Sequence, residues 1–161
     1  VMTVRDNVDV LIVAMHWGVE YTHEPTAYQR DMANYLASLG VDIIIGTHPH
    51  VIQPIEWIDD TLVIYSLGNF ISAQYQNENY NKMVGLMTSL EINKKVVGKN
   101  VEISISNVDN DLVYTYYKSW RNFKVIPFSN SEIGNYLPDY KSVYDYYKKI
   151  VKRYDNSISV K

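Results

Sequence analysis

The sequence predicts an α/β protein, with a βαβ unit followed by a β-rich extension and a C-terminal helix. Two apolar runs separated by an amphipathic segment predict the βαβ unit, and a change to β-rich segments after Met83 predicts the extension. The 161 residues, 47% hydrophobic and 20% charged, suffice for one globular domain. We therefore expect a single domain over residues 1–161. Its βαβ unit is expected in residues 1–81, and its basic, β-rich part with the terminal helix in residues 82–161.

The βαβ unit is predicted by three segments in order. Residues 9–15 and 42–45 are nearly continuous apolar runs, which is typical of strands covered on both faces. Between them, after Pro25 and before Gly40, apolar residues recur at helical spacing: Tyr28, Met32, Tyr35, Leu36 and Leu39. Because such crossover connections are right-handed, we expect the two strands to be parallel.

The remaining elements are predicted by local composition. Residues 53–58 and 62–65 flank a turn at 59–61, and we expect them to pair as a hairpin or to add a third strand to the sheet. The polar residues 73–82 predict a loop. Four β-rich segments, separated by polar breaks at 93–95, 109–111 and 121–122, predict an antiparallel extension: 86–92, 101–108, 113–117 and 123–125. After Pro138, helical spacing of apolar and aromatic residues predicts a helix over 141–154.

Composition excludes several classes of function. The absence of cysteine excludes a disulfide framework, a thiolate metal site and cysteine catalysis. The longest apolar run, residues 10–15, is far shorter than the ~20 residues that cross a bilayer. The net charge of −3 argues against a general nucleic-acid binder.

The charge is unevenly divided along the chain. Residues 1–81 carry two basic and ten acidic groups, whereas residues 82–161 carry thirteen basic and eight acidic groups. The basic half is either an ordinary solvated surface or a face that binds a polyanion. Under the second interpretation, the binding residues are those of the terminal helix: Lys148, Lys149, Lys152 and Arg153.

Three histidines follow the two predicted parallel strands. His16 follows the first, and His48 and His50 follow the second, so all three are expected at one edge of the sheet. In an extended segment, His48 and His50 would project to the same side, with Pro49 fixing φ between them. Because neutral imidazole binds zinc, manganese and iron, the three residues are candidate metal ligands. The alternative is that they are hydrogen-bonded structural residues.

Other polar residues lie near these strand ends. Glu20 is a candidate general base or a surface carboxylate, and Asn69 is a candidate group for orienting a ligand or binding an oxyanion, or an ordinary turn residue. His23 is expected to be exposed to solvent. Trp17 and Tyr65 are expected to pack in the core.

Four motifs carry a family resemblance: residues 16–21 (HWGVEY), Pro25 with Gln29, residues 46–51 (GTHPHV) with Gln53 and Glu56, and residues 65–70 (YSLGNF). The chain resembles the CapA-type poly-γ-glutamate capsule-synthesis family, a branch of the calcineurin-like metallophosphoesterase superfamily. The resemblance covers about residues 9–70. It implies a metallophosphatase-like sandwich, with His16, His48 and His50 as ligands of a divalent metal such as Mn²⁺, Zn²⁺ or Fe²⁺.

The resemblance also implies that some of the superfamily's metal-binding motifs are missing from this chain. The superfamily's Asp-x-His, Gly-Asp and Gly-Asn-His-like motifs do not precede His16, and family members are about twice as long. We therefore expect the chain to be the C-terminal portion of a longer protein, inactive alone and dependent on the missing N-terminal half for metal binding. An exposed sheet edge is expected to favour self-association. The resemblance implies a location at the cell surface or outside the cell, with membrane association through a segment not in this chain.

Three functions follow from these observations. The first is a metal-dependent hydrolase or transferase, in which the ion polarises a phosphoryl or acyl oxygen and generates hydroxide. The second is a non-catalytic accessory protein that binds or exports an anionic polymer such as poly-γ-glutamate, in contact with other capsule-synthesis membrane proteins, with the histidines structural or vestigial. The third is an α/β fragment whose histidines are structural.

Overall fold

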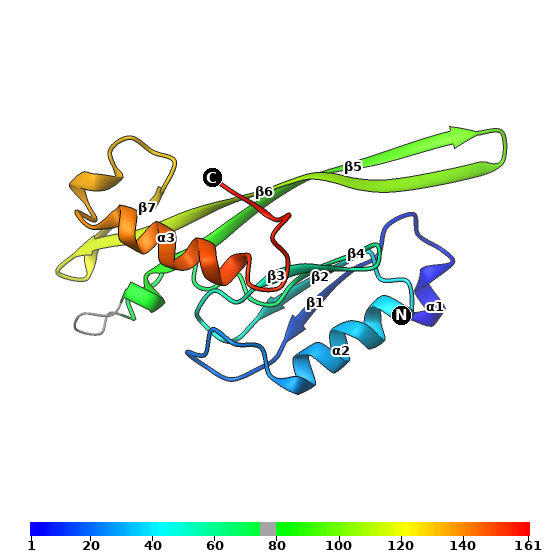
Figure 1. The fold of residues 1–161 in the computed structure, drawn as a ribbon, viewed down its shortest axis with the longest axis horizontal. Helices are drawn as coiled ribbons and strands as arrows, with labels where there is room; N and C mark the ends of the chain where they lie inside the picture. The colour runs from blue at the N-terminus through cyan, green and yellow to red at the C-terminus, as the bar shows by residue number, and fades with distance from the viewer. Residues whose placement is uncertain (75–79) are drawn as a thin grey trace.

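The computed structural model describes residues 1–74 and 80–161 and contains two β-sheets and two long helices (Figure 1). The first sheet is formed by the N-terminal half of the chain. Its strands, in spatial order, are β1 (Ile12–His16), β2 (Ile43–Thr47), β4 (Thr61–Ile64) and β3 (Ile55–Ile58). The predicted α/β class is confirmed.

The βαβ unit is formed by β1, α2 (Ala27–Ser38) and β2. Thr26 caps the helix, because its hydroxyl accepts from the backbone N–H of Gln29 while the Gln29 side chain accepts from the backbone N–H of Thr26. β1 and β2 pair in parallel, with Met15 opposite Gly46 and His16 opposite Thr47. The predicted topology is confirmed, and it brings the carboxyl ends of both strands to one edge.

The burial predicted for the first strand is wrong. β1 is an edge strand whose side chains alternate between exposed and half-buried, and Ile12 is 50% exposed. β2, with a neighbour on each side, has the burial predicted for both strands, and Ile43 and Ile44 are fully buried. The difference arises because strand order, rather than local composition, decides which strand is covered.

The two alternatives for residues 53–65 both occur. β3 and β4 form an antiparallel hairpin around a turn at Asp59 and Asp60, and β4 also pairs in parallel with β2. All four residues of β4 are buried. Of the predicted loop at 73–82, residues 75–79 lie outside the described part, and Tyr80–Lys82 form a short 3-10 helix, η1.

The second sheet contains the antiparallel extension. Its strands are β5 (Val84–Val97), β6 (Asn100–Lys118) and β7 (Arg121–Pro127), with the short β8 (Ser159–Val160) parallel to β6. The polar breaks predicted at 93–95 and 109–111 lie inside strands, because cross-strand pairing extends through them. Residues 121–122, the third predicted break, begin β7.

Beyond a register shift between Ser89 and Glu91, β5 and β6 continue as a two-stranded ribbon, the arm, formed by residues 91–105. The arm extends away from the rest of the molecule (Figure 1). Its apolar side chains are mostly on one face, as the paired residues Ile92 and Ile105, and Val96 and Val101, show. An ion pair of 2.6 Å between Lys94 Nζ and Asp9 Oδ2 links the arm to the N-terminal segment.

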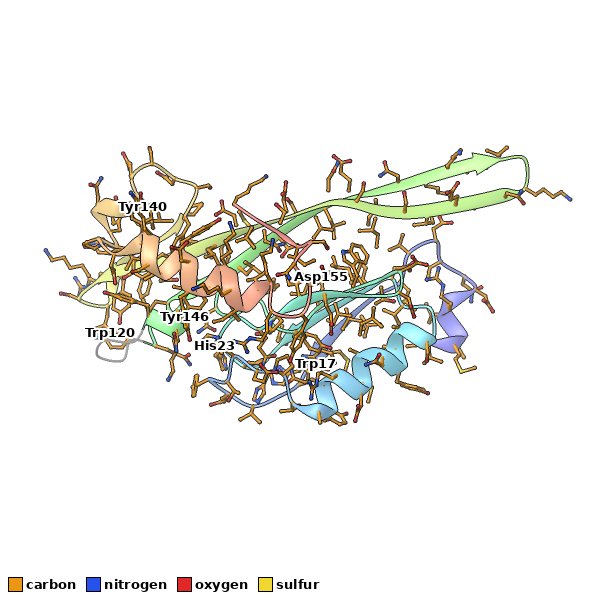
Figure 2. All side chains as sticks on the ribbon, viewed as in Figure 1. Trp17, His23, Trp120, Tyr140, Tyr146 and Asp155 are labelled. Carbon is orange, nitrogen blue, oxygen red and sulfur yellow. The ribbon has the colours of Figure 1, made fainter. Side chains whose placement is uncertain are left out.

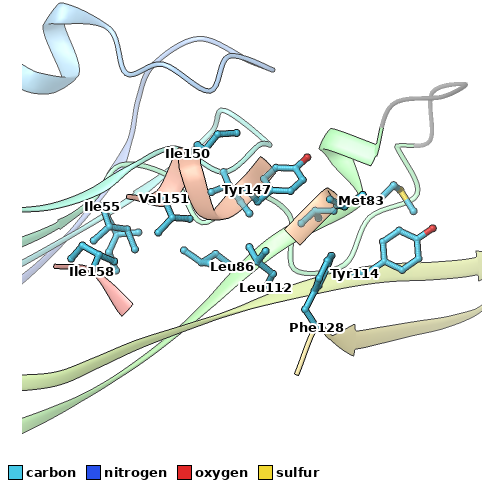
Figure 3. Packing of buried hydrophobic residues seen from close by; sticks show 14 of the residues in the cluster. Ile55, Met83, Leu86, Leu112, Tyr114, Phe128, Tyr147, Ile150, Val151 and Ile158 are labelled. Carbon is cyan, nitrogen blue, oxygen red and sulfur yellow. The ribbon is translucent and has the colours of Figure 1, made fainter. Parts of the chain in front are cut away.

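The core joins both sheets and the C-terminal helix α3 (Tyr140–Val151). Figure 3 shows Tyr147, Ile150 and Val151 of α3 beside Leu86 and Leu112 of the second sheet. Ile43, Ile55 and Leu62 of the first sheet belong to the same cluster. A second, smaller cluster lies on the opposite face of that sheet, where Ile44 and Val63 pack against Ala33 and Leu36 of α2. The first sheet is therefore covered by α2 on one face and by the second sheet and α3 on the other.

Two short helices complete the fold. α1 (Met2–Arg5) precedes the first sheet, and the 3-10 helix η2 (Ile133–Asn135) precedes α3. Arg5 Nη1 lies 2.5 Å from Asp42 Oδ2, which ties α1 to the start of β2. None of the helices in the described ranges has the length and apolar character needed to cross a membrane.

Candidate functional site

The three candidate ligand histidines lie together at the carboxyl ends of β1 and β2. His16 is the last residue of β1 and pairs with Thr47, so the residues after β2 lie beside it. The ring centroids of His16 and His48 are 4.5 Å apart, and those of His48 and His50 are 6.3 Å apart. His16 is exposed, whereas His48 and His50 are half-buried. The strand-end argument therefore predicted the cluster correctly.

The backbone that presents His48 and His50 is not extended, contrary to the prediction. φ is +95° at His48 and +58° at His50, and both values lie in the left-handed region that costs a residue other than glycine about 1–3 kcal/mol. Within this bend, the carbonyl of Pro49 accepts a 2.7 Å hydrogen bond from the backbone N–H of Tyr21. The rings approach each other through this bend rather than through the alternation of a strand.

Gly46 has no side chain, which leaves space for a hydrogen bond between Trp17 and Tyr65. The Trp17 indole Nε1 donates a 2.9 Å hydrogen bond to the carbonyl oxygen of Tyr65, passing over Gly46. A Cβ at position 46 would lie 1.9 Å from that oxygen and 2.5 Å from Nε1. Trp17 and Tyr65 are buried and stacked, with ring centroids 5.9 Å apart, so their predicted packing role is confirmed.

Asn69 sets the orientation and the tautomer of His50. The Asn69 amide nitrogen donates to the carbonyl of Lys82 at 3.1 Å and to the side-chain oxygen of Gln74 at 3.3 Å, which turns the amide oxygen toward His50. That oxygen lies 3.0 Å from His50 Nδ1. Because an amide oxygen only accepts, Nδ1 carries the proton in the neutral ring. His50 therefore presents the free lone pair of Nε2.

Thr47 has the same relation to His16. Its hydroxyl donates to the carbonyl of Met15 at 3.0 Å and so has no second proton to give. The same oxygen lies 3.4 Å from His16 Nδ1, which must then act as the donor. His16 and His50 thus both have their Nδ1 atoms bonded to neighbours, which leaves the unprotonated lone pair on Nε2, as in histidines that bind metals through Nε2.

Replacing Asn69 by alanine is expected to release His50 from this tautomer. Without the acceptor, the proton is no longer fixed at Nδ1, and metal affinity at Nε2 is expected to fall by about 10–100-fold. Imidazole ¹⁵N chemical shifts of the metal-free chain measure the tautomer directly. Asn34→Ala, which removes an exposed amide on α2, is the matched control. A His50 spectrum unchanged by Asn69→Ala would contradict the assignment.

The other residues near the cluster come from the loop after β1 and from η1. The Glu20 carboxylate is exposed and lies beside the hydroxyl group of Tyr21. Desolvation, and then the Glu20 charge, raise the pKa of Tyr21, whose ring centroid is 6.0 Å from that of His50. Lys82 Nζ lies 3.5 Å from the centroid of the Tyr21 ring. No local pattern in the sequence indicates that this cation lies near the cluster, because Lys82 comes 32 residues after His50 along the chain.

The donor chemistry of the cluster fits a divalent transition metal, since neutral imidazole nitrogens are ligands that such ions prefer. Within residues 1–74 and 80–161, however, no group of three or more His, Cys, Asp or Glu side chains is arranged to hold a metal ion. The described cluster therefore supplies candidate ligands but not a closed coordination shell.

The four candidate polymer-binding residues also lie together. Lys148, Lys149, Lys152 and Arg153 line an open pocket of about 430 Å³ at the end of α3, along with Asp145 and Asn156. The Arg153 guanidinium also donates to the carboxylate of Glu24, which leaves the three lysines as the cations best placed to bind an anion.

His23 is half-buried, so the prediction that it is exposed to solvent is wrong. Its Nδ1 lies 2.7 Å from the carbonyl oxygen of Ile52, and its ring makes edge contacts with Tyr146 and Tyr147 of α3. Burial lowers the pKa of His23, which favours the neutral ring. The helix that covers it comes more than 100 residues later, so no local signal in the sequence indicates the burial.

The residue after His23 links the histidine-bearing loop to the C-terminal helix. The Glu24 carboxylate accepts hydrogen bonds from Arg153 and from the hydroxyl group of Tyr154. The bond from Tyr154 lowers the pKa of Glu24, and Arg153 lowers it further. In Tyr154, burial and this bond raise the pKa to about 12. The Glu24 carboxylate therefore links the loop to the basic pocket, beside the ring contacts of His23 with α3.

Comparison with known proteins gives a family match over the N-terminal residues and similarity to curated proteins. Residues 1–74, which include all three clustered histidines and Asn69, match the family described as bacterial capsule synthesis protein PGA_cap. Over 70 residues the chain is 44% identical to the PGA biosynthesis protein CapA of Bacillus subtilis (strain 168), and this match covers 44% of the chain and 18% of that protein. A match to the capsule biosynthesis protein CapA of Bacillus anthracis has 40% identity over 70 residues, or 44% of the chain and 17% of that protein. The match thus spans less than a fifth of either relative.

Proposed function

We propose, from the match of residues 1–74 to the capsule synthesis family and from the similarity to two CapA proteins, that the chain acts in capsule or poly-γ-glutamate biosynthesis through a metallophosphoesterase-like metal site. The observation that carries the proposal is the cluster of His16, His48 and His50 at two adjacent strand ends. In this proposal the protein acts at the cell surface.

In this proposal His16, His48 and His50 bind a divalent ion such as Mn²⁺, Zn²⁺ or Fe²⁺ through ring nitrogens, while Thr47 and Asn69 fix the rings. A bound ion of this kind supplies Lewis-acid chemistry and activates water near neutral pH. Because the match spans under a fifth of the CapA relatives, we propose that the remaining ligands come from protein outside this chain. Hydrolysis is accordingly proposed for the longer protein rather than for these residues alone.

Calorimetric titration with Mn²⁺ and Zn²⁺ tests the proposal. The unsubstituted chain is expected to bind at least one of the two ions, and the double variant His48→Ala/His50→Ala is expected to lose the binding. His23→Gln is the matched control, because that histidine lies outside the cluster and bonds to Ile52. Absence of binding by the unsubstituted chain, or equal binding by the double variant, would refute a metal half-site in this chain.

A second candidate function is a non-catalytic accessory protein that binds an anionic polymer, with the histidines structural or vestigial. The pocket lined by Lys148, Lys149 and Lys152 favours it, because a polycarboxylate needs several cations close together. The two candidate functions use different surfaces, so both functions are compatible with one chain.

Binding of poly-γ-glutamate tests this second function. Replacing Lys148, Lys149 and Lys152 together by glutamine is expected to weaken binding roughly tenfold, as expected for the loss of three exposed ion pairs. The binding is also expected to weaken as salt is added. Lys94→Gln/Lys95→Gln, on the arm, is the control with two charges removed elsewhere. Unchanged affinity in the triple variant would assign the polymer to another surface.

A further inference from the structure

The hairpin between β6 and β7 has a turn that its sequence does not favour. Lys118 pairs with Arg121, so Ser119 and Trp120 form a two-residue turn, and both have positive φ, +50° and +59°. Turns of this kind favour glycine and asparagine. The β5–β6 turn follows that preference, with Gly98 at φ +64°. In the β6–β7 turn, a large aromatic residue occupies such a position.

Trp120 is not buried, so packing does not offset the cost of its positive φ. Trp120 is 70% exposed and lies at one end of the molecule (Figure 2). Its ring centroid is 5.6 Å from that of Tyr117, which in turn stacks on Phe123 at 5.0 Å. Phe123 is 38% exposed. Trp120 and Phe123 thus expose apolar ring surface on either side of the half-buried ring of Tyr117. An exposed indole, which is apolar and carries one polar N–H, suits the boundary between water and lipid.

Three cations lie on the two strands that carry Tyr117 and Phe123. Residues 112–131 contain Lys118, Arg121 and Lys124 and no acidic residue. Lys124 donates to the hydroxyl group of Tyr136 at 3.0 Å. Lys118 and Arg121, which flank the turn, are exposed and form no ion pair with any residue in the described part of the chain. We call Tyr117, Trp120, Phe123, Lys118 and Arg121 the aromatic tip.

We propose that the aromatic tip docks on an anionic lipid surface, with Trp120 in the interfacial layer and Lys118 and Arg121 on the headgroups. A soluble polyanion would neutralise the two cations but would leave the rings in water. A bilayer provides anionic groups beside an apolar medium, which matches the arrangement of charges around rings. The proposal is independent of the metal site, and its test requires no metal.

Sedimentation with lipid vesicles tests the proposal. The chain is expected to bind vesicles of phosphatidylcholine that contain roughly one-third phosphatidylglycerol, and to bind pure phosphatidylcholine much less. Binding is expected to move tryptophan emission to shorter wavelength. Trp17 is already buried and Trp57 is partly buried, so this shift should come from Trp120.

Trp120→Asn separates docking from folding. Asparagine suits a turn with positive φ, so the variant is expected to melt no lower than the unsubstituted chain. It is expected to bind anionic vesicles roughly tenfold more weakly and to lose the emission shift. Lys118→Gln/Arg121→Gln is expected to weaken binding to anionic vesicles as well. Val97→Ser, which removes a 63% exposed apolar side chain from the arm, is the matched control and should bind normally.

Three results would overturn the proposal. The first is no binding of the unsubstituted chain to anionic vesicles, and the second is equal binding by Trp120→Asn. The third is weakened binding of soluble poly-γ-glutamate by Trp120→Asn while vesicle binding stays intact, which would assign the tip to the polymer.

Discussion

Replacing Gly46 by alanine is expected to lower the melting temperature by roughly 6–12 °C, which corresponds to about 3 kcal/mol of unfolding free energy. The new methyl group would lie 1.9 Å from the carbonyl oxygen of Tyr65, a backbone atom of the neighbouring chain segment. It would also displace the Trp17 indole, whose Nε1 would lie 2.5 Å from it. Because position 46 leads directly into His48 and His50, the variant should also disorder the histidine cluster. Thermal unfolding followed by circular dichroism measures the first effect, and histidine NMR signals report the second.

Gly134→Ala is the matched control for this prediction. Its added Cβ would lie 3.5 Å from the ring of Tyr140, an ordinary contact, and the position does not have positive φ. Its melting temperature should therefore stay within a few degrees of the unsubstituted chain, at about 0.5 kcal/mol or less. Equal effects of the two substitutions would show that the crossing of Trp17 over Gly46 does not constrain the fold.

Replacing Tyr147 by alanine is expected to cost about 3–5 kcal/mol of unfolding free energy. Tyr147 is 1% exposed, and its ring makes edge contacts with His23 and Tyr146. Its hydroxyl group donates a 2.8 Å hydrogen bond to the side-chain oxygen of Asn81. Burial raises the pKa of Tyr147, so the phenol keeps its proton for this bond. Chemical denaturation measures the loss.

Two neighbouring changes separate the causes of this loss. Tyr147→Phe retains the ring and removes the hydrogen bond, so about 1 kcal/mol is expected. Tyr146→Ala truncates the adjacent ring, which is 50% exposed, and is expected to cost less than about 1 kcal/mol. If Tyr146→Ala and Tyr147→Ala destabilised the chain equally, α3 would not depend on the buried ring.

The sequence predicted the elements of the βαβ unit because their signals are local. Periodicity identifies α2, and short apolar runs identify β1 and β2, within a few residues of their bounds. The exposure of β1 was not predictable in this way, since an apolar run does not show whether its strand lies at the edge or in the centre of the sheet. The same limit explains the second sheet, where cross-strand pairing extends β5 and β6 through polar residues that locally predict breaks.

The histidine cluster was predictable because parallel strands end at one edge of a sheet, so the positions after them must meet. The backbone of that cluster was not predictable, because the bend at His48 and His50 packs against a different loop, where the backbone N–H of Tyr21 donates to the carbonyl of Pro49. Burial of His23 depends on α3, at the far end of the chain. Contacts of this kind arise only when distant segments pack together.

The arm has consequences for how the molecule opens. Beyond the register shift at Ser89 and Glu91, the backbones of its two strands pair with each other, the ion pair from Lys94 to Asp9 is itself exposed, and residues 91–102 are all exposed. A two-stranded ribbon without a core is only marginally stable by itself. Its amide protons should therefore exchange with solvent before those of β2 and β4, through an opening that leaves the two cores intact. In limited proteolysis, the turn at Gly98 should likewise be the first site of cleavage.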